Sequence, residues 1–187
     1  MSTQQNLNGK KVAILLTAGF EEVEMTKPRA ALDEAGATTH IISPKGGEVK
    51  AWDSTDWGDS YDVDLGLDAA DPNQYDALLL PGGVINPDTL RQNDKAVQFV
   101  KHFFAANKPV AAICHAPIML IEAGVVDGKK LTSYPSIKTD LKNAGANWVN
   151  EQVVTDGNLV TSRNPDDIPA FNEGMIALFA DGVKVNA

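Results

Sequence analysis

The chain has 187 residues, 43% of them hydrophobic and 22% charged, which is the size and composition of one globular domain with a buried core. Its formal net charge of −9 disfavours contact with phosphate backbones and anionic lipids, so we expect no nucleic-acid partner and no membrane partner. The apolar runs are too short for a membrane span or a secretory signal, and the single cysteine cannot form an internal disulfide, so we expect a cytoplasmic protein.

The N-terminal part of the chain alternates short apolar segments with helical ones. In chain order we predict a strand at 12–16, a helix at 21–35, a strand at 39–43, a hairpin-like excursion within 45–70, a strand at 75–80, a helix at 94–107 and a strand at 109–113. Pro28 is expected to kink the first helix or to mark a restart, because proline lacks the N–H that a helix interior needs.

The same alternation continues to the C-terminus. We predict a helix at 115–123, a strand at 130–133, a helix at 136–143, strands near 148–155 and 159–162, and a helix at 168–179. Strands that alternate with helices of this length indicate an α/β fold with a mostly parallel sheet covered on both faces. Ligands of such sheets bind beyond the carboxyl ends of the strands, where Gly19, Gly82 and Cys114 all fall.

One domain without repeats or linkers is expected, preceded by a polar tail. The tail covers residues 1–10 and the domain covers 11–187. The sequence has no GxGxxG or GKS/T phosphate loop, and no cysteine pair or HExxH motif at metal-ligand spacing. We therefore predict neither a cofactor nor a metal.

Cys114 lies at the junction of a predicted strand and a predicted helix. The segment AICHA at 112–116 has the small-x-nucleophile-x-small spacing of a nucleophile elbow, in which small flanking residues allow a sharp turn. A cysteine at a helix N-terminus is expected to have a lowered pKa and to stand exposed at the turn, ready to react. The alternative is a buried structural cysteine.

Other polar and glycine residues gather at the same edge of the sheet. His115 would act as proton acceptor and donor if its ring reaches the thiol, although sequence adjacency alone fits a structural histidine equally well. Backbone N–H groups of Gly82 and Gly83 would approach a developing oxyanion, or simply form a turn. Glu21 and Glu24 open the first helix, where the helix dipole alone favours carboxylates.

Several stretches resemble the PfpI (ThiJ/PfpI) family, the intracellular cysteine peptidase or amidase-like branch of the superfamily that includes the parkinsonism-associated deglycase. The resemblance covers nearly the whole chain. Five segments carry it in the family's order: 19–24 (GFEEVE), 76–83 (DALLLPGG), 108–115 (KPVAAICH), 131–135 (LTSYP) and 143–148 (NAGANW).

The resemblance implies a flavodoxin-like three-layer α/β/α sandwich of the class I glutamine amidotransferase type, with Cys114 as nucleophile and His115 beside it. It places on Glu24 the carboxyl that contacts the thiol, and a carboxyl so close to sulfur should have a raised pKa. Asp88 matches the position of an acid donated by a neighbouring subunit, which implies a homo-oligomer, either a dimer or a hexamer. The loop before Asp88 is one residue longer than in the peptidase prototype. Tyr134 resembles a family residue near the site.

The predicted function is that of a PfpI-family, cysteine-dependent hydrolase or lyase that acts on carbonyl substrates in stress protection, by deglycase, glyoxalase-like or peptidase chemistry. Its substrates would be a small carbonyl compound, a peptide or a glycated protein. The oxyanion would be held by the N–H of Gly83 and the amide that follows Cys114. Two alternatives use the same cysteine or the same fold, namely a non-enzymatic oxidative-stress sensor and a chaperone.

Overall fold

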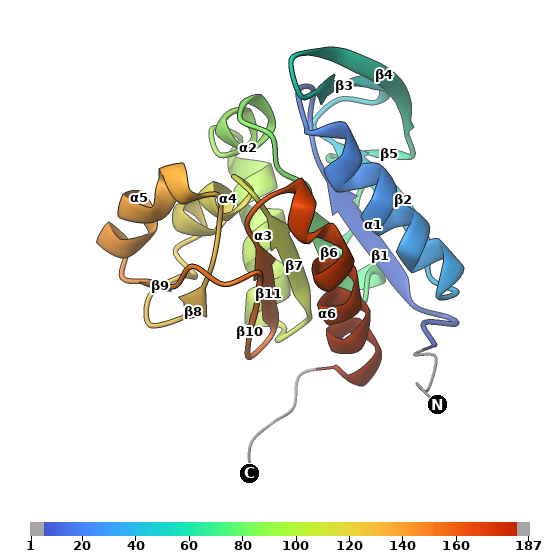
Figure 1. Cartoon of the computed structure of the whole chain (residues 1–187). Coiled ribbons are helices and arrows are strands. Elements are labelled where there is room, and N and C mark those ends of the chain that lie inside the picture. Colours follow the sequence, from blue (N-terminus) through green and yellow to red (C-terminus); the bar gives the residue numbers. More distant parts are fainter. Residues whose placement is uncertain (1–5, 183–187) are drawn as a thin grey trace.

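A seven-stranded sheet forms the middle of the molecule in the computed structural model, which describes residues 6–182 (Figure 1). Its strands are β1 (Lys11–Leu15), β2 (Thr38–Ser43), β5 (Leu65–Gly66), β6 (Ala77–Leu80), β7 (Val110–Ile113), β10 (Val153–Asp156) and β11 (Leu159–Ser162). They lie in the order β10-β11-β7-β6-β1-β2-β5, and every neighbouring pair is parallel except β10 with β11. The predicted α/β fold with a mostly parallel sheet is therefore confirmed.

Helices cover both faces of this sheet. The helices are α1 (Glu22–Glu34), α2 (Ile85–Leu90), α3 (Asp94–Ala105), α4 (Pro117–Glu122), α5 (Lys138–Asn143) and α6 (Ile168–Asp181). Helices α1 and α6 lie in front of the sheet in Figure 1, and α3 lies behind it. Along β1, Val12 and Ile14 pack toward α1 and α6, while Ala13 and Leu15 pack toward α3 and α4. Burial on both faces explains why the central strands are continuous apolar runs.

Residues 45–70 fold into the predicted hairpin. Strands β3 (Gly47–Asp53) and β4 (Asp56–Val63) pair antiparallel outside the main sheet, and the hairpin lies beside the start of α1 (Figure 1). Two carboxylate side chains at the start of α1 bind the hairpin. Glu22 accepts hydrogen bonds from the Tyr61 hydroxyl (2.7 Å) and the Asp59 N–H (3.0 Å), and Glu21 accepts one from the Ser54 N–H (3.1 Å).

The elements differ from expectation in three places. The strand expected near 148–155 is two strands, because β9 (Asn147–Trp148) pairs with β8 (Lys130–Leu131) in a separate two-stranded sheet, and β10 starts only at Val153. Helix α2 was not predicted. Pro28 does not mark a restart, since α1 runs unbroken through it with the proline ring buried.

The predicted N-terminal tail is in part packed against the domain. Leu7 is buried, and its N–H donates to the carbonyl of Ala35 at 2.8 Å. Residues 1–5 of that tail, and residues 183–187 of the predicted domain, lie outside the described residues. Within 6–182, none of the helices combines the length and the apolar character needed to cross a membrane.

Candidate active site

The elbow at Cys114 is a strained and well-anchored turn. Cys114 follows the last residue of β7 and has φ of +63°, a left-handed conformation that costs free energy in a residue other than glycine. Its N–H donates to the carbonyl of Ser162 (3.0 Å), and its own carbonyl accepts from the N–H of Tyr134 (2.8 Å). Ala112 and Ala116 are both buried, which agrees with the need for small side chains at this turn.

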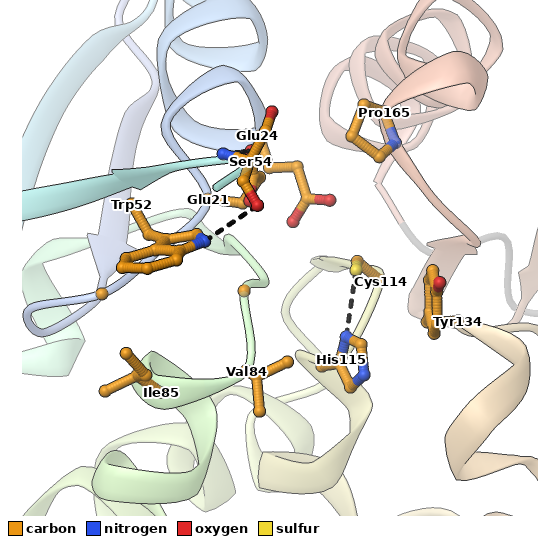
Figure 2. A pocket seen from close by; sticks show the side chains of 12 residues that line it. Glu21, Glu24, Trp52, Ser54, Val84, Ile85, Cys114, His115, Tyr134 and Pro165 are labelled. Carbon is orange, nitrogen blue, oxygen red and sulfur yellow. Dashed lines mark hydrogen bonds between the residues drawn. The ribbon is translucent and has the colours of Figure 1, made fainter. Parts of the chain in front are cut away.

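Cys114 faces a pocket of about 460 Å³ at the carboxyl edge of the sheet. In Figure 2, Trp52 stands on one side of this pocket and Tyr134, with Cys114 beside it, on the other; Glu21 and Glu24 lie between the two sides. The lining residues are Gly19, Glu21, Glu24, Trp52, Ser54, Gly83, Val84, Ile85, Cys114, His115, Tyr134 and Pro165. In the described part of the chain, this lining includes two carboxyl groups and neither lysine nor arginine.

His115 connects the thiol to a hydroxyl that the sequence analysis missed. Its Nδ1 atom lies 3.2 Å from the sulfur of Cys114, and its Nε2 atom lies 3.0 Å from Oγ of Ser136. The ring stacks on Tyr134, with 4.6 Å between the ring centroids and 22° between their planes. Ser136 directly follows the segment 131–135 that carries the family resemblance, and this neighbourhood was the only signal in the sequence that could have pointed to it.

Glu24 is fully buried beside the thiol. One carboxyl oxygen, Oε2, accepts a hydrogen bond from the N–H of Gly82 at 2.9 Å. The other oxygen, Oε1, has no well-aligned hydrogen-bond partner within residues 6–182. The contact with the adjoining Cys114 thiol offsets part of the effect that burial has on the pKa of Glu24. Burial, and then the charge of Glu21, raise the pKa of Glu24 to about 8, against the opposing effect of these hydrogen bonds. The pKa is raised in the predicted direction, but burial is the first cause, and the contact with Cys114 acts to lower it.

The expectation that Cys114 is exposed and has a lowered pKa is wrong. Only 6% of the residue is exposed, and it forms part of the pocket wall. Burial, followed by the Glu24 charge, raises the pKa of the thiol. Helix α4 has only six residues, so its dipole is too short to reverse these effects. Cys114 therefore rests as a thiol, and the pair formed with Glu24 carries at most one negative charge.

Two backbone N–H groups nevertheless lie near the sulfur. The N–H groups of Gly83 and His115 interact with Cys114 and act to lower the pKa of the thiol. Gly83 has φ of +82°, and a Cβ there would lie 2.6 Å from the carbonyl oxygen of Gly19, so only glycine fits this close approach. The N–H of Gly82 is not available to an oxyanion, because it is bonded to Glu24.

His115 and Glu21 differ in what they contact and in how burial shifts their pKa values. Burial lowers the pKa of His115, which keeps the imidazole neutral and able to accept a proton. Burial also raises the pKa of Glu21, whose Oε1 atom holds the N–H of Ser54 in the hairpin. Glu21 lines the pocket further from the sulfur than Glu24, as Figure 2 shows.

Two predicted site residues, Gly82 and Asp88, do not line the pocket; Gly82 contacts Glu24 beside it, whereas Asp88 lies apart. It lies on α2, its side chain is 62% exposed, and its carboxylate is 3.9 Å from the guanidinium of Arg91. It is absent from the residues that line the pocket. Within residues 6–182, no group of three or more His, Cys, Asp or Glu side chains is placed to hold a metal ion.

Comparison with known proteins identifies the family. Residues 10–178 match the DJ-1/PfpI family. The chain belongs to this family. It is 48% identical to general stress protein 18 of Bacillus subtilis over 172 residues, covering 91% of this chain and 98% of that protein. A deglycase of Thermococcus kodakarensis is 43% identical over 168 residues, which covers 90% of this chain and 98% of that protein.

A solved structure shares the DJ-1/PfpI fold described above. The crystal structure of DJ-1beta from Drosophila melanogaster superposes with a TM-score of 0.84 at 31% identity, covering 91% of this chain and 90% of that one. Family membership and fold thus confirm the resemblance drawn from the five sequence segments. The roles of the individual site residues do not follow from these likenesses and are argued below from the geometry.

Proposed function

We propose that this protein is a cysteine-dependent hydrolase or lyase that attacks carbonyl carbon, with Cys114 as nucleophile, and that it serves in stress protection. The observation that carries the proposal is the contact of the Cys114 sulfur with a neutral histidine, at a strained elbow that opens on a pocket. Nucleophile and base lie within hydrogen-bond reach, as covalent catalysis requires. The likeness to a relative named as a deglycase, and to one named as a stress protein, supports the same conclusion.

The first chemical step follows from the groups that surround the sulfur. As the sulfur attacks an aldehyde carbon, its proton passes to Nδ1 of His115 and the carbonyl electrons move to oxygen. His115 then returns the proton to that oxygen, which completes a hemithioacetal. The N–H groups of Gly83 and His115 lie beside the sulfur, where they would stabilise the developing negative charge. For methylglyoxal, transfer of the aldehyde hydrogen to the neighbouring carbon and hydrolysis of the thioester give lactate, with net addition of water.

Glu24 has a second task in this scheme. With a pKa of about 8, its carboxyl is largely protonated and uncharged at neutral pH, so it does not repel a developing thiolate. The protonated carboxyl therefore favours the thiolate at the moment when the proton leaves Cys114. Asp88 would take part only from a second copy of the chain, because its own exposed side chain does not line the pocket.

Replacement of the nucleophile tests the proposal. We expect Cys114→Ser to reduce turnover of methylglyoxal, of methylglyoxal-modified arginine and of a small peptide amide by about 10³-fold or more, for whichever of these the wild type converts. Circular dichroism and thermal unfolding check that the variant folds. Equal rates for wild type and Cys114→Ser on all three substrates would refute the enzymatic proposal.

A second function is favoured by the N–H groups that lie near the sulfur. The same donors, together with protonated Glu24, would hold the two oxygens of a sulfinic acid, so a peroxide-sensing role uses this geometry equally well. Mass spectrometry after mild peroxide treatment distinguishes the two. A stable two-oxygen adduct on Cys114, in a protein that turns over none of the three substrates, would favour the sensor.

A further inference from the structure

Ser136 occupies the place beside His115 that an orienting group has in hydrolytic triads. The ring of His115 reaches the sulfur of Cys114 through Nδ1 at 3.2 Å and the hydroxyl of Ser136 through Nε2 at 3.0 Å. Nucleophile, base and a third group therefore follow one another within a single chain. In enzymes of this kind, the third group holds the imidazole in the tautomer that can take the proton.

A hydroxyl at Nε2 can accept the hydrogen bond of the reactive tautomer. A neutral imidazole has one N–H and one acceptor nitrogen, so Nδ1 can accept the thiol proton only when the ring proton is on Nε2. The oxygen of Ser136 can accept that Nε2–H bond before proton transfer, when the ring is neutral. It can also accept the bond after transfer, when the ring is an imidazolium. The same contact thus persists through the proton transfer.

The backbone that carries Ser136 is anchored to the elbow itself. The N–H of Tyr134 donates to the carbonyl of Cys114 at 2.8 Å, and the Tyr134 ring stacks on His115. The residue before Tyr134, Ser133, is fixed by the indole N–H of Trp148 at 2.9 Å. Ser136 lies two residues beyond Tyr134, in the 3-10 turn Pro135–Ile137. The distance from Ser136 to His115 is therefore set by contacts independent of the hydroxyl.

We propose that Ser136 is the positioning residue of this site, and that it orients His115 and selects the Nε2–H tautomer without help from a second subunit. This inference rests on the proposed function, in which His115 accepts the thiol proton. It differs from the expectation that Asp88 of a neighbouring copy fills the same place. The neutral hydroxyl also suits a histidine that burial keeps neutral at rest.

The expected effect is modest because Ser136 is exposed and water can replace its hydroxyl. A hydrogen bond of this kind contributes about 0.5–1.5 kcal/mol, which corresponds to about a two- to tenfold change in rate. We therefore expect Ser136→Ala to lower kcat for methylglyoxal about two- to tenfold with an unchanged KM. Ser136→Thr, which keeps the hydroxyl, should restore most of the loss.

Two measurements test the inference without relying on turnover. Cys114 is the only cysteine of the sequence, so the rate of alkylation by iodoacetamide reports its reactivity directly. Nitrogen-15 spectra of the imidazole rings report the tautomer of His115, identified among the three histidines by its loss in His115→Asn. Ser136→Ala should slow alkylation about two- to tenfold and should change the single Nε2–H pattern into a mixture. Thr139→Ala, an exposed hydroxyl removed from the next helix, should match the wild type in both.

The outcomes separate the possibilities. If Ser136→Ala keeps the wild-type tautomer, the inference is overturned, whether or not alkylation slows, because a slower reaction would then be a structural effect. If Asp88→Asn changes the tautomer and Ser136→Ala does not, the acid of a second copy orients His115 instead. Absence of methylglyoxal turnover in the wild type would count against the proposed function alone, since the ring spectra would still decide the role of Ser136.

Discussion

Glu24 makes the stability of the fold depend on pH in a direction opposite to that of most carboxylates. Its pKa is raised from 4.5 to about 8, chiefly because the side chain is buried. The unfolded chain therefore releases this proton at a lower pH than the folded chain does. The stability that Glu24 contributes is fully present below about pH 4.5 and is lost as the pH rises toward 8. Glu24→Gln keeps the shape of the side chain and removes the titration.

The size of the effect follows from the two pKa values. A shift from 4.5 to about 8 corresponds to roughly 5 kcal/mol in total, of which about 3 to 4 kcal/mol falls between pH 5 and pH 8. This is a substantial part of the 5 to 15 kcal/mol typical of a folded domain. Because burial is the first cause of the shift, most of the effect should remain when the sulfur is removed in Cys114→Ala.

Urea unfolding at pH 5, 6, 7 and 8 provides the measurement, at one protein concentration so that any self-association stays constant. Between pH 5 and 8, the free energy of unfolding of Glu24→Gln should fall by about 3 to 4 kcal/mol less than that of the wild type. Glu34→Gln, an exposed substitution on the same helix, should keep the wild-type dependence. A Glu24→Gln variant with the same pH dependence as the wild type would show that Glu24 does not take up a proton in this range, and the proton assignment above would fail.

Two further predictions concern the pocket. Glu21→Gln should lower kcat/KM for cationic methylglyoxal-modified arginine about fivefold relative to kcat/KM for neutral methylglyoxal, because one half-buried charge contributes on the order of 1 kcal/mol. Glu34→Gln is the control. If Glu21→Gln leaves the ratio of the two kcat/KM values unchanged, this charge selection is refuted. Gly82→Ala places a Cβ against the Glu24 carboxyl and 2.7 Å from the Cβ of Cys114. It should therefore lower the free energy of unfolding in urea by about 1 to 3 kcal/mol and slow the alkylation of Cys114. Gly46→Ala, which has open space around it, should do neither.

The central fold could be predicted because each of its strands carries its own signal. Apart from the exposed Lys11 that opens β1, the runs at β1, β6 and β7 are apolar at every position, and only a sheet covered on both faces buries all these apolar residues. The sequence does not predict which short strands pair outside the main sheet. The stretch from Trp148 to Thr155 was read as one strand, but β9 pairs with β8 and only β10 reaches the main sheet. Which neighbour a short strand pairs with is a tertiary property that composition does not encode.

Helix α2 was missed for a related reason. Its six residues contain Asn86 and Pro87, which are typical of turns, and the helix holds together through contacts with other segments. The buried side chain of Asn86 accepts from the N–H of Thr17 and donates to the carbonyls of Pro81 and Gly82. These three bonds connect α2 to the loops after β1 and β6, and no local sequence pattern predicts them.

The candidate site was predictable in its parts and not in its electrostatics. The spacing at 112–116 located the elbow, and the resemblance located Glu24, but the position of Cys114 at a turn before a helix suggested an exposed thiol of low pKa. Burial depends on what the rest of the chain places around the sulfur, and here it includes a carboxyl at a distance where two charges cannot coexist. Ser136 was missed because a serine in a loop carries no signal of the histidine that it contacts.

A buried thiol of raised pKa can still serve as a nucleophile if its proton leaves only when the substrate is bound. A permanently ionised sulfur in this wall of the pocket would be a buried charge, and the cost would fall on the folded state. A thiol whose proton can pass to neutral His115 avoids that cost at rest, while the N–H groups of Gly83 and His115 remain near the place where charge develops. Reactivity at Cys114 should therefore be governed by the groups that receive its proton and stabilise its charge, and the resting pKa of the thiol should be a poor guide to it.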